Sequence, residues 1–421
     1  MAMKFRVLLS SVVVLAVMSL ANCGHYVCGV ELGSSSCTPS GGGVSQGGGT
    51  SSTNAAYVFA VDTSAGTMDG YTLDTTADTL SATASYSAPT IPQDTGAGMV
   101  VAQGTYLYAS FRTTDQIFGW SISSGGALTT ISGSPYTAAF LTSIDAGAVA
   151  QQNMIANPAG TLLFFSDPVQ DTIYVYQIGT GGVLTAVSGS PFAVPFGPLN
   201  LTTDGKGKYL YATDGFFGAH TATQIAAFAI SSTGSLTAVA GSPFQYPMWQ
   251  VQGEPTGLYL IGTSGQSVST SGLDDNHLYV FSINQTSGAI SPVSGSPFST
   301  QFSPFTIAVQ PNSGGNLVYS FGINDTDTGY NPIEGYQINA TTGALTAVSG
   351  SPFSGGTEGY WGQFDQSGTF LLDYSSIIDQ GTNTVVTTLG AFDVSSVGAL
   401  TQPFSPLTLT TGGYWTITDV P

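Results

Sequence analysis

The sequence predicts an all-β protein, a seven-bladed β-propeller built from four-stranded antiparallel blades. Three observations predict this fold: a composition that disfavours helices, seven copies of one sequence unit, and a unit divided between the two ends of the repeat region. The 421 residues include 55 glycines and 11% aromatic residues, whereas charged residues make up only 7%. Such a composition is typical of short strands joined by many tight turns.

Each unit contains an aromatic residue followed two positions later by an aliphatic residue, which places both side chains on one face of a strand. The pair occurs as Tyr71/Leu73, Trp120/Ile122, Tyr176/Ile178, Phe228/Ile230, Phe281/Ile283, Tyr336/Ile338 and Phe392/Val394. A turn such as T-G-x-L-T and another strand follow, and five copies then carry [SA]-G-S-P-[FY]. Two further apolar segments precede each pair. Each unit of about 53 residues therefore holds four strands, as a propeller blade does.

The repeat region begins in the middle of a unit. Its first copy starts at Tyr57, which corresponds to the second strand of later copies. The chain ends with residues 414–419, which resemble the first strand of the last complete copy at residues 360–365. We expect the C-terminal strand to complete blade 1 as its innermost strand, because this hides two sheet edges. A solenoid, the structural alternative, would need capping repeats.

Residues 1–22 are predicted to be an export signal. Lys4 and Arg6 precede an apolar stretch that is too short to span a membrane and long enough for a signal peptide. The segment L-A-N-C resembles a lipoprotein cleavage box, with Cys23 as the lipidated residue. Ordinary signal peptidase could instead cut after Ala21 and release a free protein.

Residues 23–55 are predicted to be a flexible tether rich in glycine and serine, and residues 56–421 to be the propeller. If Cys23 is lipidated, Cys28 and Cys37 form an even pair that can make a disulfide in an oxidising compartment. We expect an exported protein, either lipid-anchored in the cell envelope or free in the periplasm or medium.

The net charge of −19 excludes several kinds of partner. Phosphate backbones and anionic membrane surfaces would be repelled, so we expect no nucleic acid, and membrane contact only through a lipid anchor. A strongly anionic substrate is disfavoured for the same reason. The expected partner is a small molecule, a glycan or an envelope protein, and we expect the protein to be a monomer.

The order of Y-L-Y strand, aromatic-x-aliphatic strand, T-G-x-L-T turn and S-G-S-P-F segment resembles the seven-bladed lactonase-like propellers. This family includes bacterial 6-phosphogluconolactonase and fungal muconate-cyclising enzymes, and the resemblance covers about residues 57–421. It implies lactone hydrolysis or a related cycloisomerisation, with clustered arginine and histidine where the lactone is anionic. Few basic residues are present here, so an uncharged or weakly charged lactone fits better than 6-phosphogluconolactone. The main expectation is a binding module without catalysis, and the alternative is a lactone hydrolase.

The functional site is expected on the face that carries the loops after each second strand and the connections between blades, because these vary in length and content. Asp62, Asp167 and Asp214 occupy one equivalent position there, just past the second strand of blades 1, 3 and 4. Arg112 occupies the same region of blade 2. It could polarise a carbonyl between flanking carboxylates, or form an ordinary surface salt bridge.

Two histidines belong to loops of the same face. His220 or His277 could act as general base for lactone opening near Arg112, or be an exposed loop residue. Residues 274–275 and 324–327 are rich in oxygen ligands for calcium but lack EF-hand spacing, so polar turns are the preferred interpretation. No metal or other cofactor is expected, with calcium as the alternative.

Three tryptophans are expected near the starts of innermost strands, next to the mouth of the central channel: Trp249, Trp361 and Trp415. Aromatic rings at this place could stack on a sugar ring or an apolar ligand. They could equally pack between neighbouring blades.

Overall fold

The computed structural model describes residues 55–62, 67–74, 77, 79–87, 97–111, 116–137, 154–214, 224–264, 275–311, 316–323, 332–354, 361–379, 384–411 and 417–420. The predicted export signal, the lipidation site Cys23 and the cysteine pair Cys28 and Cys37 lie outside these residues. Among the described residues, no helix is long and apolar enough to cross a membrane.

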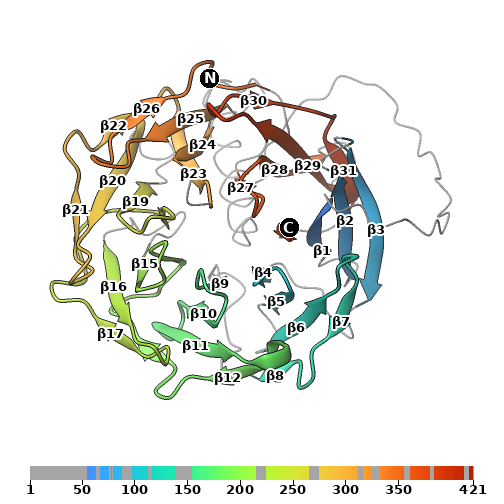
Figure 1. The fold of residues 1–421 in the computed structure, drawn as a ribbon, viewed down its shortest axis with the longest axis horizontal. Coiled ribbons are helices and arrows are strands. Elements are labelled where there is room, and N and C mark those ends of the chain that lie inside the picture. The colour runs from blue at the N-terminus through green and yellow to red at the C-terminus, as the bar shows by residue number, and fades with distance from the viewer. Residues whose placement is uncertain are drawn as a thin grey trace, which may run out of the picture.

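Seven antiparallel sheets are arranged as blades in a ring (Figure 1), which confirms the predicted fold. The innermost strands of blades 1 to 7 are β32 (Ile417–Val420), β4 (Ala97–Ala102), β9 (Met154–Ala156), β14 (Asn200–Thr203), β18 (Gln250–Gly253), β23 (Ser303–Val309) and β27 (Trp361–Phe364). The second strands are β1 (Ala55–Asp62), β5 (Tyr106–Phe111), β10 (Leu162–Asp167), β15 (Tyr209–Thr213), β19 (Tyr259–Thr263), β24 (Leu317–Ile323) and β28 (Phe370–Asp379).

The outer half of each blade follows the same order. The third strands are β2 (Thr67–Asp74), β6 (Gln116–Ile122), β11 (Thr172–Ile178), β16 (Ile225–Ile230), β20 (His277–Ile283), β25 (Ile333–Ile338) and β29 (Thr384–Val394). The fourth strands are β3 (Thr79–Ser87), β7 (Leu128–Thr130), β12 (Leu184–Ala186), β17 (Leu236–Ala238), β21 (Ile290–Pro292), β26 (Leu345–Ala347) and β30 (Leu400–Thr401). One short 3-10 turn, η1 (Thr180–Gly182), precedes β12.

Blade 1 combines the two ends of the repeat region. The strand β32 pairs antiparallel with β1, with Tyr57 opposite Val420 and Ala60 opposite Ile417. The predicted composite blade is therefore confirmed. In this pairing Thr418 lies opposite Phe59.

The outer edge of most blades differs from the single fourth strand that the sequence predicted. In blades 2, 3, 5 and 7 the third strand also pairs with a second short segment: β8 (Tyr136–Thr137), β13 (Phe192–Ala193), β22 (Phe298–Ser299) and β31 (Leu407–Thr411). In blades 4 and 6 single bridges, Ile225 to Phe244 and Ile333 to Phe353, take its place. The [SA]-G-S-P-[FY] motif therefore divides the outer edge into two short segments.

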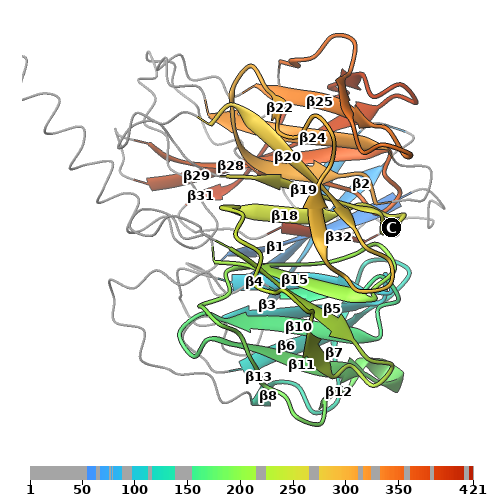
Figure 2. The same ribbon diagram turned by 90° about the vertical axis from the view of Figure 1, so that its left-hand side faces the viewer.

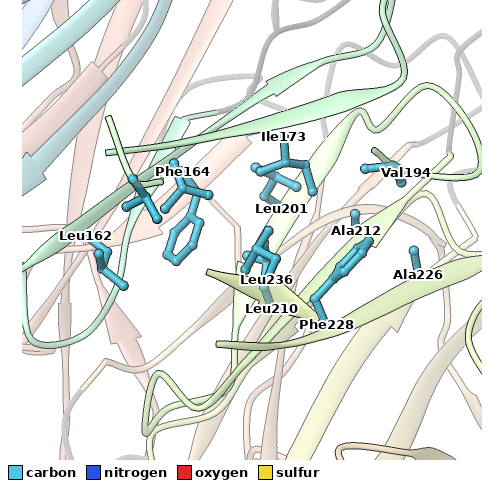
Figure 3. Close-up of a cluster of buried hydrophobic side chains, with 12 residues drawn as sticks. Leu162, Phe164, Ile173, Val194, Leu201, Leu210, Ala212, Ala226, Phe228 and Leu236 are labelled. Atoms are coloured by element: carbon cyan, nitrogen blue, oxygen red, sulfur yellow. The ribbon is translucent and has the colours of Figure 1, made fainter. Parts of the chain in front are cut away.

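The hydrophobic core lies between neighbouring blades. One cluster combines Leu162, Phe164 and Ile173 of blade 3 with Leu201 and Leu210 of blade 4, all buried (Figure 3). Equivalent clusters occupy the other junctions. Burial of these apolar surfaces is the main stabilising term, so each blade depends on both of its neighbours.

Blade 7 extends further than the others on one side of the ring. Its strands β28 and β29 have 10 and 11 residues. When the ring is viewed from the side, β28 and β29 extend further to the left than the neighbouring strands (Figure 2).

Candidate functional site

The starts of the innermost strands bring aromatic side chains of three consecutive blades together. Trp249 directly precedes β18, Phe305 lies in β23, and Trp361 is the first residue of β27. The ring centroids of Trp249 and Phe305 are 5.5 Å apart, and those of Phe305 and Trp361 are 5.8 Å apart in an edge-on arrangement. We call these three residues the mouth cluster.

Phe305 joins the two tryptophans because its strand contains a β-bulge. Pro304 lies opposite Gly322 and Thr306 opposite Phe321, so the register of the strand shifts by one residue at Phe305. A bulge turns one side chain out of the regular alternation of a strand. The sequence analysis missed Phe305, and its place near the start of an apolar innermost strand was the available signal.

Hydroxyl groups of the preceding blade fix the backbone of the mouth cluster. Thr213 Oγ1 in blade 4 donates to the Trp249 carbonyl at 2.9 Å, and Thr263 Oγ1 in blade 5 donates to the Phe305 carbonyl at 3.0 Å. Both threonines end second strands and are fully buried. The aromatic rings therefore rest on a rigid support rather than on loops.

Side-chain amides of the innermost strands join the same blades below the mouth cluster. Asn200 Oδ1 accepts a hydrogen bond from the Val251 N–H at 3.3 Å, and Gln250 Oε1 accepts one from the Ile307 N–H at 2.9 Å. These contacts run from blade 4 through blade 5 to blade 6. They hold the innermost strands in fixed register beneath the site.

Two buried polar side chains lie beside the mouth cluster. Asp373 in β28 is directly opposite Gly362, the residue after Trp361, and is 1% exposed. Ser264 directly follows Thr263, and its buried hydroxyl has no hydrogen-bond partner among the described residues. Sequence reasoning missed both, because neither stands in a recognisable motif.

The predicted aspartates have different surroundings. Asp167 is buried and accepts hydrogen bonds from the backbone N–H groups of Val169 and Gln170, both at 3.1 Å. Asp214 accepts one from the Gln224 N–H at 3.1 Å. These contacts order the turns after the second strands. The side chain of Asp62 lies outside the described residues.

His277 begins β20, the third strand of blade 5, and belongs to a small polar group. Its Nδ1 lies 2.8 Å from Asp275 Oδ1, and the Tyr279 hydroxyl donates to Asp275 Oδ2 at 2.8 Å. Burial, followed by the hydrogen bond to Asp275, raises the pKa of Tyr279 to about 12. A carboxylate in this position orients the imidazole and leaves its Nε2 atom for another partner.

The structure does not place His277 within the mouth cluster. Strand β19 separates β18 from β20, so His277 and Trp249 lie on strands about 10 Å apart. Arg112, His220 and Trp415 lie outside the described residues, and their predicted roles stay predictions. Within the part of the chain that is described, no group of three His, Cys, Asp or Glu side chains could hold a metal ion.

Comparison with known proteins finds one matching protein family and several solved structures with the same fold. Residues 153–358 match the family model of the seven-bladed β-propeller lactonases. A search of curated protein sequences gives no match.

Several solved structures share the fold over nearly their whole length. A candidate 6-phosphogluconolactonase from Bacteroides uniformis has 14% sequence identity and a TM-score of 0.60, over 86% of this chain and 99% of that one. A second candidate 6-phosphogluconolactonase, from Bacteroides fragilis, has 13% identity and a TM-score of 0.61, over 88% and 99% of the two chains.

The structure of a periplasmic gluconolactonase from Pseudomonas aeruginosa is similar to the same extent. Its sequence identity is 14% and its TM-score 0.55, over 87% of this chain and 100% of that one. At such identities the likeness establishes the fold alone.

Proposed function

Because the chain is a lactonase-like seven-bladed β-propeller, we propose that it opens an uncharged lactone at the mouth cluster. The observation that supports this site is the contact between the rings of Trp249, Phe305 and Trp361. The backbone of the cluster is held in place by a hydrogen bond from the Thr263 hydroxyl to the Phe305 carbonyl. Ligand sites in proteins are mostly apolar and aromatic, with a few polar groups that fix orientation. Trp249 and Phe305 are buried, so Trp361, which is only half-buried, is the member of the cluster that can offer an aromatic face to the apolar face of a sugar-like ring.

The charge of the protein favours a neutral substrate. The chain carries 24 acidic and 5 basic side chains, and the buried carboxyl group of Asp373 lies beside the mouth cluster. Phosphorylated or carboxylated lactones would be repelled by this distribution. The Pseudomonas aeruginosa neighbour is described as a gluconolactonase, and gluconolactone is itself uncharged.

The reaction adds one water molecule to the lactone. The water oxygen bonds to the carbonyl carbon, the ring ester C–O bond breaks, and the released oxygen takes a proton to give a hydroxy acid. His277 is the described side chain best prepared to accept a proton from water, because Asp275 engages its Nδ1 atom.

Hydrolysis of a matched pair of lactones tests the proposal. D-glucono-1,5-lactone and its 6-phosphate would be followed by acid release, with spontaneous hydrolysis subtracted. We expect kcat/KM for the neutral lactone to be at least about 10-fold higher, and His277→Ala to lower kcat by about 100-fold. Val397→Ala is the control, because Val397 is an exposed turn residue. Rates at the uncatalysed level with both lactones would refute hydrolysis.

A binding module without catalysis is the second candidate. The separation of His277 from the mouth cluster by an intervening strand favours it. In that case calorimetry would detect binding of the neutral lactone or its hydroxy acid product, while the lactone disappears no faster than in buffer. Loss of binding in Trp361→Ala would then place the ligand at the mouth cluster.

A further inference from the structure

A hollow of about 410 Å³ lies between blades 3 and 4, on the face opposite the mouth cluster. Leu162, Ile178 and Ile230 supply apolar surface, and Asn157, Thr161 and Ser232 supply polar surface. No charged side chain lines it among the described residues. The hollow is therefore suited to a small neutral molecule.

The hollow lies at a junction between blades where one position of the repeat carries leucine instead of tyrosine. In blades 1, 2, 4 and 5 the first residue of the Y-L-Y strand, or its equivalent, is a tyrosine whose ring packs against a turn glycine of the next blade. The pairs are Tyr57 with Gly126, Tyr106 with Gly182, Tyr209 with Gly288, and Tyr259 with Gly343. In blade 3 the same position is Leu162, which packs against Gly234, and in blade 6 it is Leu317, which packs against Gly398.

Leucine replaces only the near half of the tyrosine side chain. Its Cδ2 atom reaches the turn glycine, but the far edge of the ring and the hydroxyl group are missing. At the junction of blades 1 and 2, the Tyr57 hydroxyl donates to the Ser124 carbonyl at 3.1 Å. The residue in the same place relative to the turn glycine of blade 4 is Ser232, which lines the hollow.

We propose that this hollow binds a small neutral phenol, which takes the place of the missing tyrosine ring. The ring would pack on Leu162 and Ile230, and its hydroxyl group would donate to the Ser232 carbonyl. A phenol with a pKa near 10 is uncharged at pH 7, so the net charge of −19 does not repel it. The hollow is larger than one ring, so a substituted phenol fits as well. This site is independent of the proposed lactone chemistry.

Binding of 4-fluorophenol, followed by fluorine NMR at pH 7, tests the proposal. We expect saturable binding that Leu162→Tyr weakens at least 10-fold, because the new side chain fills the hollow. Leu258→Tyr makes the same chemical change at an exposed leucine and should leave binding unchanged. Trp361→Ala should also leave it unchanged, which separates this site from stacking at the mouth cluster.

A gain of binding gives a second, independent readout. Tyr57→Leu should open a matching hollow between blades 1 and 2 and raise the number of bound 4-fluorophenol molecules by one. This variant decides the question if Leu162→Tyr does not fold. Unchanged binding in folded Leu162→Tyr, no added site in Tyr57→Leu, or preference for methyl glucoside over the phenol would each overturn the proposal.

Discussion

Single hydroxyl groups of one blade hold the aromatic residues of the next. Thr213 and Thr263 are both fully buried, and each donates to the carbonyl of a mouth-cluster residue. The same position is Ser110 in blade 2, where the buried hydroxyl has no partner among the described residues. The support of the mouth cluster is therefore a local property of blades 4 to 6.

Replacing Thr263 by valine keeps the shape of the side chain and removes its hydroxyl. The buried Phe305 carbonyl then loses its partner, at a cost of about 1–3 kcal/mol. We expect the Tm to fall by about 2–8 °C and KM for the neutral lactone to rise. Thr263→Ser, which keeps the hydroxyl, should stay close to the wild type. An equal fall of the Tm in Thr263→Val and Thr263→Ser would show that the hydroxyl group does not account for the stabilisation.

Buried tyrosines set the response of the protein to alkaline pH. Burial raises the pKa of Tyr176 to about 12, and burial together with Asp275 raises the pKa of Tyr279 to about 12. Burial also raises the pKa of Tyr108, Tyr211 and Tyr319. In the unfolded chain these groups ionise near pH 10, so between pH 10 and 12 the unfolded state binds fewer protons than the folded state.

Stability should therefore be retained up to about pH 10 and fall as the pH rises toward 12. Absorbance at 295 nm reports tyrosine ionisation, and circular dichroism reports folding. In the native protein, ionisation of these tyrosines should lag behind that of the urea-unfolded chain and coincide with loss of structure. Identical titration curves for native and unfolded protein would contradict this account.

At the scale of the elements, the [SA]-G-S-P-[FY] motif connects the two outer segments of a blade to its third strand. In each of the five copies the motif serine accepts a hydrogen bond from a third-strand N–H, as Ser242 does from Ala227 at 2.9 Å. All five Ser–Pro bonds of the motif are cis. These hydrogen bonds show that the motif has a structural role.

Ser242→Ala should leave the N–H of buried Ala227 without its acceptor. We expect destabilisation by about 1–3 kcal/mol, seen as a fall of the Tm. Ser294→Ala is the matched control, because it changes the first serine of the next copy to the alanine that blade 4 already has at that position, Ala240. A Tm of Ser242→Ala no lower than that of Ser294→Ala would rule out this role.

Strands were the most predictable elements, because seven similar units repeat the same alternation of apolar residues. The sequence could not show the bulge at Phe305 or the division of the outer edge. Both depend on pairing with distant residues, which no local pattern records. For the same reason Trp249 and Trp361 were expected at the mouth, whereas the contact that Phe305 makes between them was not.

At the scale of the whole molecule, the ring is closed by pairing between its two ends. Four residue pairs join β1 to β32 and remove the open edge of blade 1. The core clusters between blades make stability cooperative around the ring. Loss of closure should therefore affect every blade rather than blade 1 alone.

Deletion of residues 417–421 tests closure. We expect the Tm to fall by more than 10 °C, or the protein to aggregate through the exposed edge of β1, whereas deletion of Pro421 alone should be tolerated. Size-exclusion chromatography and thermal melts measure both effects. A truncated protein that remains monomeric with an unchanged Tm would show that the strand pairing contributes nothing to the ring.

The central claim is that an uncharged lactone is opened at the mouth cluster. The most direct measurement compares hydrolysis of D-glucono-1,5-lactone by the wild type, Trp361→Ala and the control Val397→Ala. The account predicts catalysis above the spontaneous rate, a KM at least about 5-fold higher in Trp361→Ala, and no change in the control. Hydrolysis by Trp361→Ala with wild-type KM and kcat, or no catalysis by the wild type, would contradict it.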